Sequence, residues 1–82
     1  MSDAGKDLSD RHDAALRQAA QARADMEAVA GRIAETEEYA AGVLEDVAAE
    51  RPERADHLRA MAARAREFAE QERRVSTGEE PA

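Results

Sequence analysis

The sequence contains no cysteine, no tryptophan and only two aromatic residues, Tyr39 and Phe68. The lack of cysteine excludes disulfide bonds and thiolate metal sites. No stretch approaches the ~20 apolar residues that a membrane-spanning helix needs. The first ten residues hold no apolar run that could serve as a signal peptide. We therefore expect a cytoplasmic protein that does not cross a membrane.

Large apolar side chains are also scarce. Hydrophobic residues make up 43% of the 82 residues, but 21 of them are alanine. Such a composition, with a net charge of −7, would normally indicate disorder. Residues 11–74, however, consist mainly of Ala, Glu, Arg, Gln, Leu and Met, which are the best helix formers. We expect an all-α chain whose small core needs a partner, such as a second copy, for stability.

The apolar residues of the first half recur in alternating steps of four and three, the pattern of a coiled-coil seam. Position a holds His12, Ala19, Met26, Ile33, Ala40 and Val47, and position d holds Leu8, Ala15, Ala22, Val29, Thr36 and Val43. Six heptads without a slip predict one helix over residues 8–50. Gly31 and Gly42 lie outside the seam, so we read them as tolerated. A break at Gly31, giving three shorter helices, is the alternative.

Pro52 predicts the end of this first helix, because its ring disfavours the α conformation in the preceding residue and blocks helical hydrogen bonding. Proline also suits the first turn of a helix. A new apolar pattern follows, which predicts a second helix over residues 53–75, with its seam at Leu58, Met61, Ala65 and Phe68. Gly78 is a suitable stop. We expect residues 1–7 to be flexible and residues 76–82 to form a flexible acidic tail.

Charge is distributed unevenly along the chain. Residues 25–50 carry a net charge of −7, residues 51–74 carry +2, and residues 1–24 balance to zero. An antiparallel helical hairpin would place the acidic half of the first helix beside the basic second helix. Each exposed ion pair contributes only about 0.2–1 kcal/mol, so charge selects this pairing more than it stabilises it. A single kinked helix is the alternative to this coiled-coil-like hairpin.

The second helix is about half as long as the first and would leave the seam from Leu8 to Ala22 facing water. Leu16 widens this uncovered stretch. A two-fold dimer that forms a four-helix bundle would cover it. We therefore predict a homodimeric coiled coil, or an adaptor that receives a partner protein's helix. The expected association interface comprises Leu8, Leu16, Met26, Val29, Ile33, Val43, Val47, Leu58, Met61 and Phe68.

The sequence offers no catalytic or metal-binding pattern. Carboxylates crowd the stretch around Glu37, but a general acid needs an apolar pocket that an alanine-rich pair of helices does not provide. His57 belongs to no Glu-x-x-His or His-Glu-x-x-His motif. The four glycines are isolated, so they cannot form a phosphate-binding loop. We expect no enzyme activity, no cofactor and no metal.

Three arginines of the second helix recur every seven residues and form a possible basic ridge: Arg59, Arg66 and Arg73. Such a ridge supports an alternative function, that of an accessory regulator that contacts nucleic acid or an acidic partner. The net negative charge, the interleaved Glu67 and Glu70, and the lack of aromatic residues for base stacking make nucleic acid an unfavourable partner. The acidic half of the first helix is a simpler partner for these arginines than nucleic acid.

Overall fold

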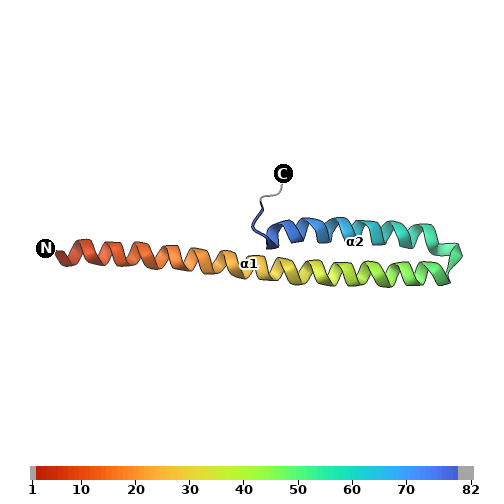
Figure 1. Ribbon diagram of the computed structural model, residues 1–82, viewed down its shortest axis with the longest axis horizontal. Coiled ribbons are helices and arrows are strands. Elements are labelled where there is room, and N and C mark those ends of the chain that lie inside the picture. The colour runs from red at the N-terminus through yellow and green to blue at the C-terminus, as the bar shows by residue number, and fades with distance from the viewer. Residues whose placement is uncertain (1, 80–82) are drawn as a thin grey trace.

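The computed structural model describes residues 2–79 and consists of two helices that lie side by side in opposite directions (Figure 1). Helix α1 spans Ser2–Glu50, a single 3-10 turn (η1) spans Pro52–Arg54, and helix α2 spans Ala55–Ser76. The described residues 2–79 include no strand. The molecule is a rod with extents of 78 × 21 × 13 Å. The predicted all-α fold is confirmed.

Helix α1 is continuous through Gly31 and Gly42, so the alternative of a break at Gly31 is wrong. The helix begins at Ser2, whereas the sequence predicted a loose segment up to residue 7. Acidic residues in the first turns favour the positive end of the helix dipole. The Asp7 carboxylate also lies 3.0 Å from the Arg11 guanidinium one turn later. Residue 1 lies outside the described part of the chain.

The connection between the helices forms where Pro52 interrupts the hydrogen-bonding pattern. Arg51 leaves the helical conformation, with φ −128° and ψ 78°, as expected for a residue that precedes proline. Its amide still donates to the Val47 carbonyl at 2.9 Å and so closes α1. Pro52 then opens the 3-10 turn, and the Arg54 amide donates to the Arg51 carbonyl at 2.9 Å. The predicted break at Pro52 is confirmed.

Helix α2 ends at Ser76, and Gly78 closes it in a Schellman motif. The Gly78 amide donates to the Val75 carbonyl at 3.0 Å, and the Glu79 amide donates to the Arg74 carbonyl at 2.8 Å. Gly78 has a φ of +78°, a left-handed conformation that glycine adopts without the steric penalty of a Cβ. The predicted stop at Gly78 is therefore confirmed. Residues 80–82 of the predicted acidic tail lie outside the described residues.

The core between the helices is built almost entirely from alanine, and we call it the alanine seam. Its members are fully buried or nearly so, and they recur every seven residues in both helices: Ala34, Ala41 and Ala48 in α1, and Ala55, Ala62 and Ala69 in α2. At the closed end Leu58 joins Ala48 and Ala55, with Leu44 and Val47 packed against them. Alanine lets helix backbones approach closely, although each residue buries little apolar area.

The helices therefore do not pair through the heptad seam that the sequence predicted. Three of the four buried alanines of α1 follow a predicted a position by one residue, as Ala34 follows Ile33 and Ala41 follows Ala40, while Ala30 follows the d position Val29. One residue turns the helix face by about 100°. In α2 the buried positions likewise include Ala62 and Ala69, whereas the predicted Phe68 is exposed. The smaller residues pack inside because they allow the closer approach.

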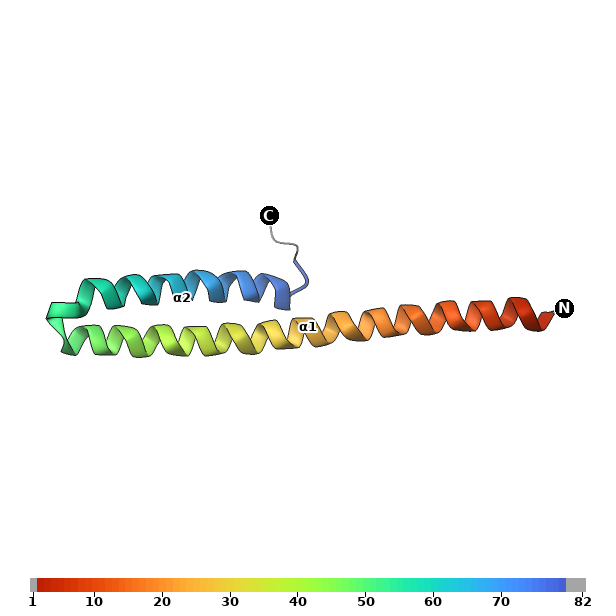
Figure 2. The same ribbon diagram turned by 180° about the vertical axis from the view of Figure 1, so that it is seen from behind.

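Helix α2 covers only the second half of α1, as the two opposite views agree (Figures 1 and 2). The end of α2 lies near the middle of α1: Ser76 approaches Gly31, and Gly78 approaches Glu27. From residue 4 to residue 26, every residue except Ala14 is exposed. We call this single-helix stretch, residues 2–26, the overhang.

Candidate association interface

The predicted heptad seam survives as an exposed apolar stripe along α1, which we call the outer stripe. Its larger members keep a third to two thirds of their surface exposed: Met26 65%, Val29 43%, Ile33 37% and Val43 43%. They are exposed because the alanine seam, about 100° around the helix, already faces α2. Helix α1 therefore carries two apolar stripes, of which the hairpin uses one.

Helix α2 contributes a second row of apolar residues on the same side of the molecule. Near the middle of α1, Val75 lies beside Met26, Val29 and Ile33. Towards the closed end, Phe68 and its neighbours Met61 and Ala65 lie beside Ala40 and Leu44. Residues of the outer stripe and of this row line two shallow depressions along the hairpin, which we together call the apolar groove.

The overhang continues the outer stripe but not the alanine seam. Leu8, on the outer stripe, is 66% exposed, and Leu16 beside it is 57% exposed. Of the positions that continue the alanine series Ala48, Ala41 and Ala34 towards the N-terminus, only Ala20 is alanine, while residues 27 and 13 are Glu and Asp. The sequence of the overhang thus provides a longer apolar contact surface on the outer stripe than on the face that would meet a longer α2.

The structure places most residues of the predicted association interface on this exposed surface, with two exceptions. Leu58 is only 6% exposed and belongs to the hairpin's own core, where Val47 packs against it. Their position at the closed end explains the difference, because the helices meet there around the turn at Pro52. Leu58 and Val47 therefore hold the hairpin together, while Leu8, Leu16, Met26, Val29, Ile33, Val43 and Phe68 are exposed and Met61 is half-buried.

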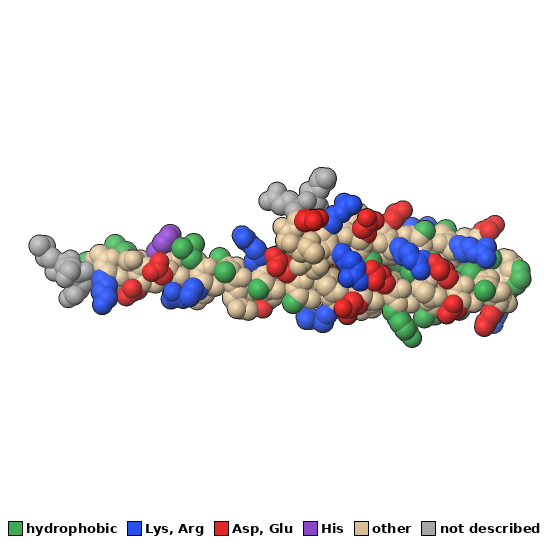
Figure 3. Space-filling view, viewed as in Figure 1, with side chains coloured by type: hydrophobic (Ala, Val, Ile, Leu, Met, Phe, Trp, Pro, Cys, Tyr) green, Lys and Arg blue, Asp and Glu red, His purple; other side chains and the backbone are tan. Residues whose placement is uncertain are grey.

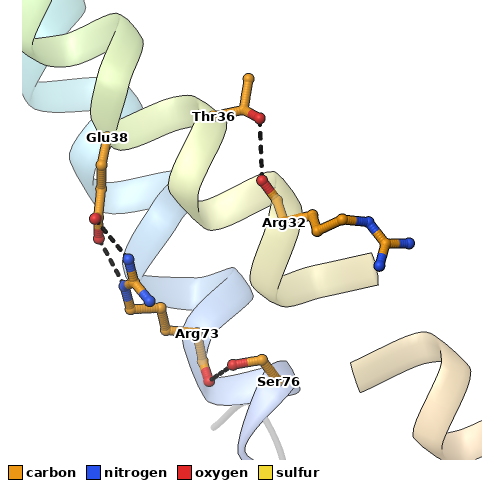
Figure 4. Close-up of polar contacts among 5 residues, drawn as sticks. All are labelled: Arg32, Thr36, Glu38, Arg73 and Ser76. Carbon is orange, nitrogen blue, oxygen red and sulfur yellow. Dashed lines mark hydrogen bonds and ion pairs between the residues drawn. The ribbon is translucent and has the colours of Figure 1, made fainter. Parts of the chain in front are cut away.

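Two ion pairs join the helices on the side away from the apolar groove. Arg73 donates from Nε to Glu38 Oε1 at 2.6 Å and from Nη2 to Glu38 Oε2 at 2.5 Å (Figure 4). Arg66 pairs with Glu45 one heptad nearer the turn. Basic and acidic side chains alternate along the boundary between the helices in Figure 3. The predicted pairing of the acidic half of α1 with the basic helix α2 is confirmed.

The spacing of residues explains why the two sides differ. Glu38 follows Val29 by nine residues, and Val75 follows Arg66 by nine residues. Nine residues are about two and a half helical turns, so the two members of each pair point in opposite directions. The paired residues Glu38 and Arg66 therefore lie on the opposite side of the hairpin from the apolar residues Val29 and Val75.

The pairing with Arg73 perturbs the ionisation of Glu38. The hydrogen bonds from Arg73 hold the pKa of the Glu38 carboxyl below its ordinary value, and partial desolvation opposes this effect. The same hydrogen bonds raise the pKa of Arg73. Arg73 also fixes the end of α2 through its carbonyl, which accepts a hydrogen bond from Ser76 Oγ at 2.7 Å (Figure 4).

The predicted basic ridge is therefore largely occupied by the chain's own carboxylates. Arg66 and Arg73 bind Glu45 and Glu38, and Arg59 forms no ion pair within residues 4–79. The heptad spacing explains the difference: the residue seven positions beyond Glu45 is Pro52, which has no carboxylate to offer. The ridge offers only one guanidinium group that is not already paired within the hairpin.

Other kinds of site have little support in the described part of the chain. Within residues 4–79 no polar or charged side chain is buried, so no carboxyl group sits in an apolar pocket. The same residues contain no group of three His, Asp or Glu side chains placed to hold a metal ion. Neither described helix is long and apolar enough to cross a lipid bilayer. The exposed apolar surface is the strongest candidate site.

The sequence analysis placed Ala40 and Ala65 on the predicted seams, but it did not single out Val75, which lines the groove beside Met26. The signal that could have located it was the second seven-residue period, that of the alanine seam. Once this seam faces α2, the residues on its flank must line a groove.

The sequence and fold match no protein family, no curated protein and no solved structure.

Proposed function

We propose that the chain is a non-catalytic helical association module that self-assembles through its outer stripe and apolar groove. The observation that supports this most strongly is the exposure of the chain's larger apolar residues, with Leu8 at 66% and Met26 at 65%. A contiguous exposed apolar surface bordered by polar residues is typical of an interaction site. Because the hairpin's core is mostly alanine, the large side chains are left to contact another molecule.

The composition supports self-association in a second way. An alanine seam buries little apolar area, and a small core stabilises a chain of this size by only about 3–5 kcal/mol. A second copy that covers the outer stripe would add its buried area to the stability of the fold. Stability should then depend on protein concentration, as it does in oligomers whose folding and association are linked.

The alternative function, contact with nucleic acid or another acidic partner through the arginine ridge, has weaker support. Two of its three guanidinium groups pair with carboxylates of the same chain. An acidic partner would have to displace Glu38 from the two hydrogen bonds that it accepts from Arg73. No observation on the described residues favours this function over self-association.

Substitution of Leu16 by glutamate tests the proposal. A charged side chain in the apolar contact should lower the mass measured by light scattering, while circular dichroism retains most of the helix signal. Ala24→Glu is the matched control, because Ala24 is exposed on the opposite side of α1 from the outer stripe. An unchanged mass for Leu16→Glu, or a wild-type chain that is monomeric at all concentrations tested, would contradict the proposal.

A further inference from the structure

We propose that the apolar groove receives the overhang of a second copy of this chain, which runs antiparallel to α1. This inference rests on the proposed self-association and specifies its geometry. Each copy would place its overhang in the groove of the other, so that the dimer is two three-helix bundles joined end to end. The arrangement differs from the four-helix bundle expected from the sequence.

The lengths of the two surfaces support this arrangement. The overhang, residues 2–26, is about 37 Å long at 1.5 Å per residue, and α2, with 22 residues, is about 33 Å long. The groove exists only where α2 lies beside α1, so the two surfaces are nearly equal in length. Two hairpins that stacked groove to groove would instead leave both overhangs exposed, with Leu8 and Leu16 in water.

An antiparallel register aligns the whole outer stripe. Antiparallel helices place an a residue of one chain in the same layer as a d residue of the other. A single register pairs a with d residues in this way along all six heptads of α1. The residue numbers in each pair have the same sum, as antiparallel order requires. Ile33 meets Ala22 of the second copy, and Met26 meets Val29 of the second copy. At the end of the stripe Val47, which the hairpin itself half-buries, meets Leu8 of the second copy. The Met26 and Val29 pairs flank the two-fold axis.

This register also gives Leu16 a packing partner in the second copy. Ala15 of one copy meets Ala40 of the second copy, and Ala40 borders the part of the groove that Phe68 lines. Leu16 lies on the flank of the overhang that would face α2 of the second copy, so it would pack against Phe68 there. This contact accounts for two large residues that the isolated hairpin leaves 57% and 45% exposed.

Charge complementarity favours the antiparallel direction. A parallel dimer would set two segments with a net charge of −7, residues 25–50 of each copy, side by side. The antiparallel dimer sets that segment beside residues 1–24, whose charges balance to zero. The same register also places Asp25 beside Arg32 of the second copy, and Arg11 beside Asp46 of the second copy. Both pairs join opposite charges.

Disulfide trapping tests the register, because the wild-type chain contains no cysteine. The double variant Ala15→Cys/Ala40→Cys should form a covalent dimer on mild oxidation, as seen on a non-reducing gel. Each single variant should stay monomeric on the same gel, since in an antiparallel dimer two copies of position 15 are about 37 Å apart. Ala22→Cys/Ala40→Cys, shifted by one heptad, is the matched control and should cross-link at least tenfold more slowly.

Charge reversal gives an independent measurement. Asp25→Arg should weaken self-association about tenfold, because it creates two repulsive pairs with Arg32 by symmetry. Adding Arg32→Asp should restore the wild-type affinity. Rapid cross-linking of Ala15→Cys alone, or a dimeric wild type whose Ala15→Cys/Ala40→Cys variant does not cross-link, would overturn the antiparallel register and leave self-association standing. A monomeric wild type would overturn both proposals.

Discussion

Glu38 and Arg73 form a bidentate ion pair across the hairpin, in which one guanidinium group binds both carboxylate oxygens at 2.6 and 2.5 Å. The two residues are separated by 35 positions in the sequence. Their pairing, repeated by Glu45 and Arg66 one heptad away, fixes which residues of α1 lie beside which residues of α2. Alanine side chains alone specify such a register poorly, because one methyl group resembles the next.

The first prediction concerns pH. Because the pKa of Glu38 is lowered in the folded state, its contribution to stability is present above the ordinary value of 4.5 and is lost as pH falls through the lower, folded-state pKa. The wild type should therefore be more stable than Glu38→Gln near neutral pH, and the difference should shrink on acidification below pH 4.5. Thermal unfolding of both proteins, followed by circular dichroism between pH 3 and 7, measures it. A difference that is independent of pH would rule out this role.

The second prediction concerns the alanine seam. Ala41 has no exposed surface, so Ala41→Leu would force α1 and α2 apart and should destabilise the hairpin by about 1–3 kcal/mol. Ala24→Leu is the matched control, because Ala24 is exposed and leucine is nearly as good a helix former as alanine. Urea unfolding at fixed protein concentration compares the two. Equal stabilities would show that the helices are not held at alanine spacing.

The third prediction separates the hairpin core from the association surface. Leu58 is 6% exposed, so Leu58→Ala should cost about 2 kcal/mol or more of hairpin stability. Phe68 is largely outside the core of the isolated hairpin, so Phe68→Ala should change the stability of a dilute sample little and weaken self-association more. Circular dichroism at low concentration and sedimentation at high concentration measure the two effects. If both variants lowered hairpin stability and self-association in the same proportion, the assignment of Leu58 to the core and Phe68 to the association surface would be wrong.

The fourth prediction concerns two glycines in different backbone conformations. Gly42 lies in α1 with open space around its missing Cβ, so Gly42→Ala should stabilise the protein by about 0.5–1 kcal/mol. Gly78 has a φ of +78°, and a Cβ there would lie 3.2 Å from a Glu27 carboxylate oxygen. Gly78→Ala should therefore destabilise the end of α2 by about 1–2 kcal/mol. Thermal unfolding of both variants tests the opposite signs.

Local sequence signals predicted the elements of this fold well. The position of Pro52 located the turn, because the geometry of a proline ring does not depend on distant residues. Gly78 located the end of α2 for the same reason, since only glycine adopts its left-handed conformation easily. The charge pattern predicted which segments lie together, and the ion pairs of Glu38 and Glu45 agree with it.

The face of α1 that packs against α2 was not predictable from the same rules. Counting large apolar residues selected the stripe through Met26 and Ile33, because such residues usually form the core. The hairpin instead buries Ala34 and Ala41. Alanine is both a helix former and a small core residue, so its presence in a sequence does not reveal which role it has. Only the shared seven-residue period in two separate helices distinguishes them.

Alanine has no side-chain rotamers to lose, so burying it costs no side-chain entropy. The hairpin thus leaves most of the larger side chains of α1's outer stripe, among them Leu8, Met26 and Val29, outside its core. Under the proposed self-association, substitutions among those larger side chains would alter which helix binds, and how tightly, without unfolding the hairpin that presents them. Such a division of labour would allow assembly specificity to diverge in evolution while the architecture stays fixed.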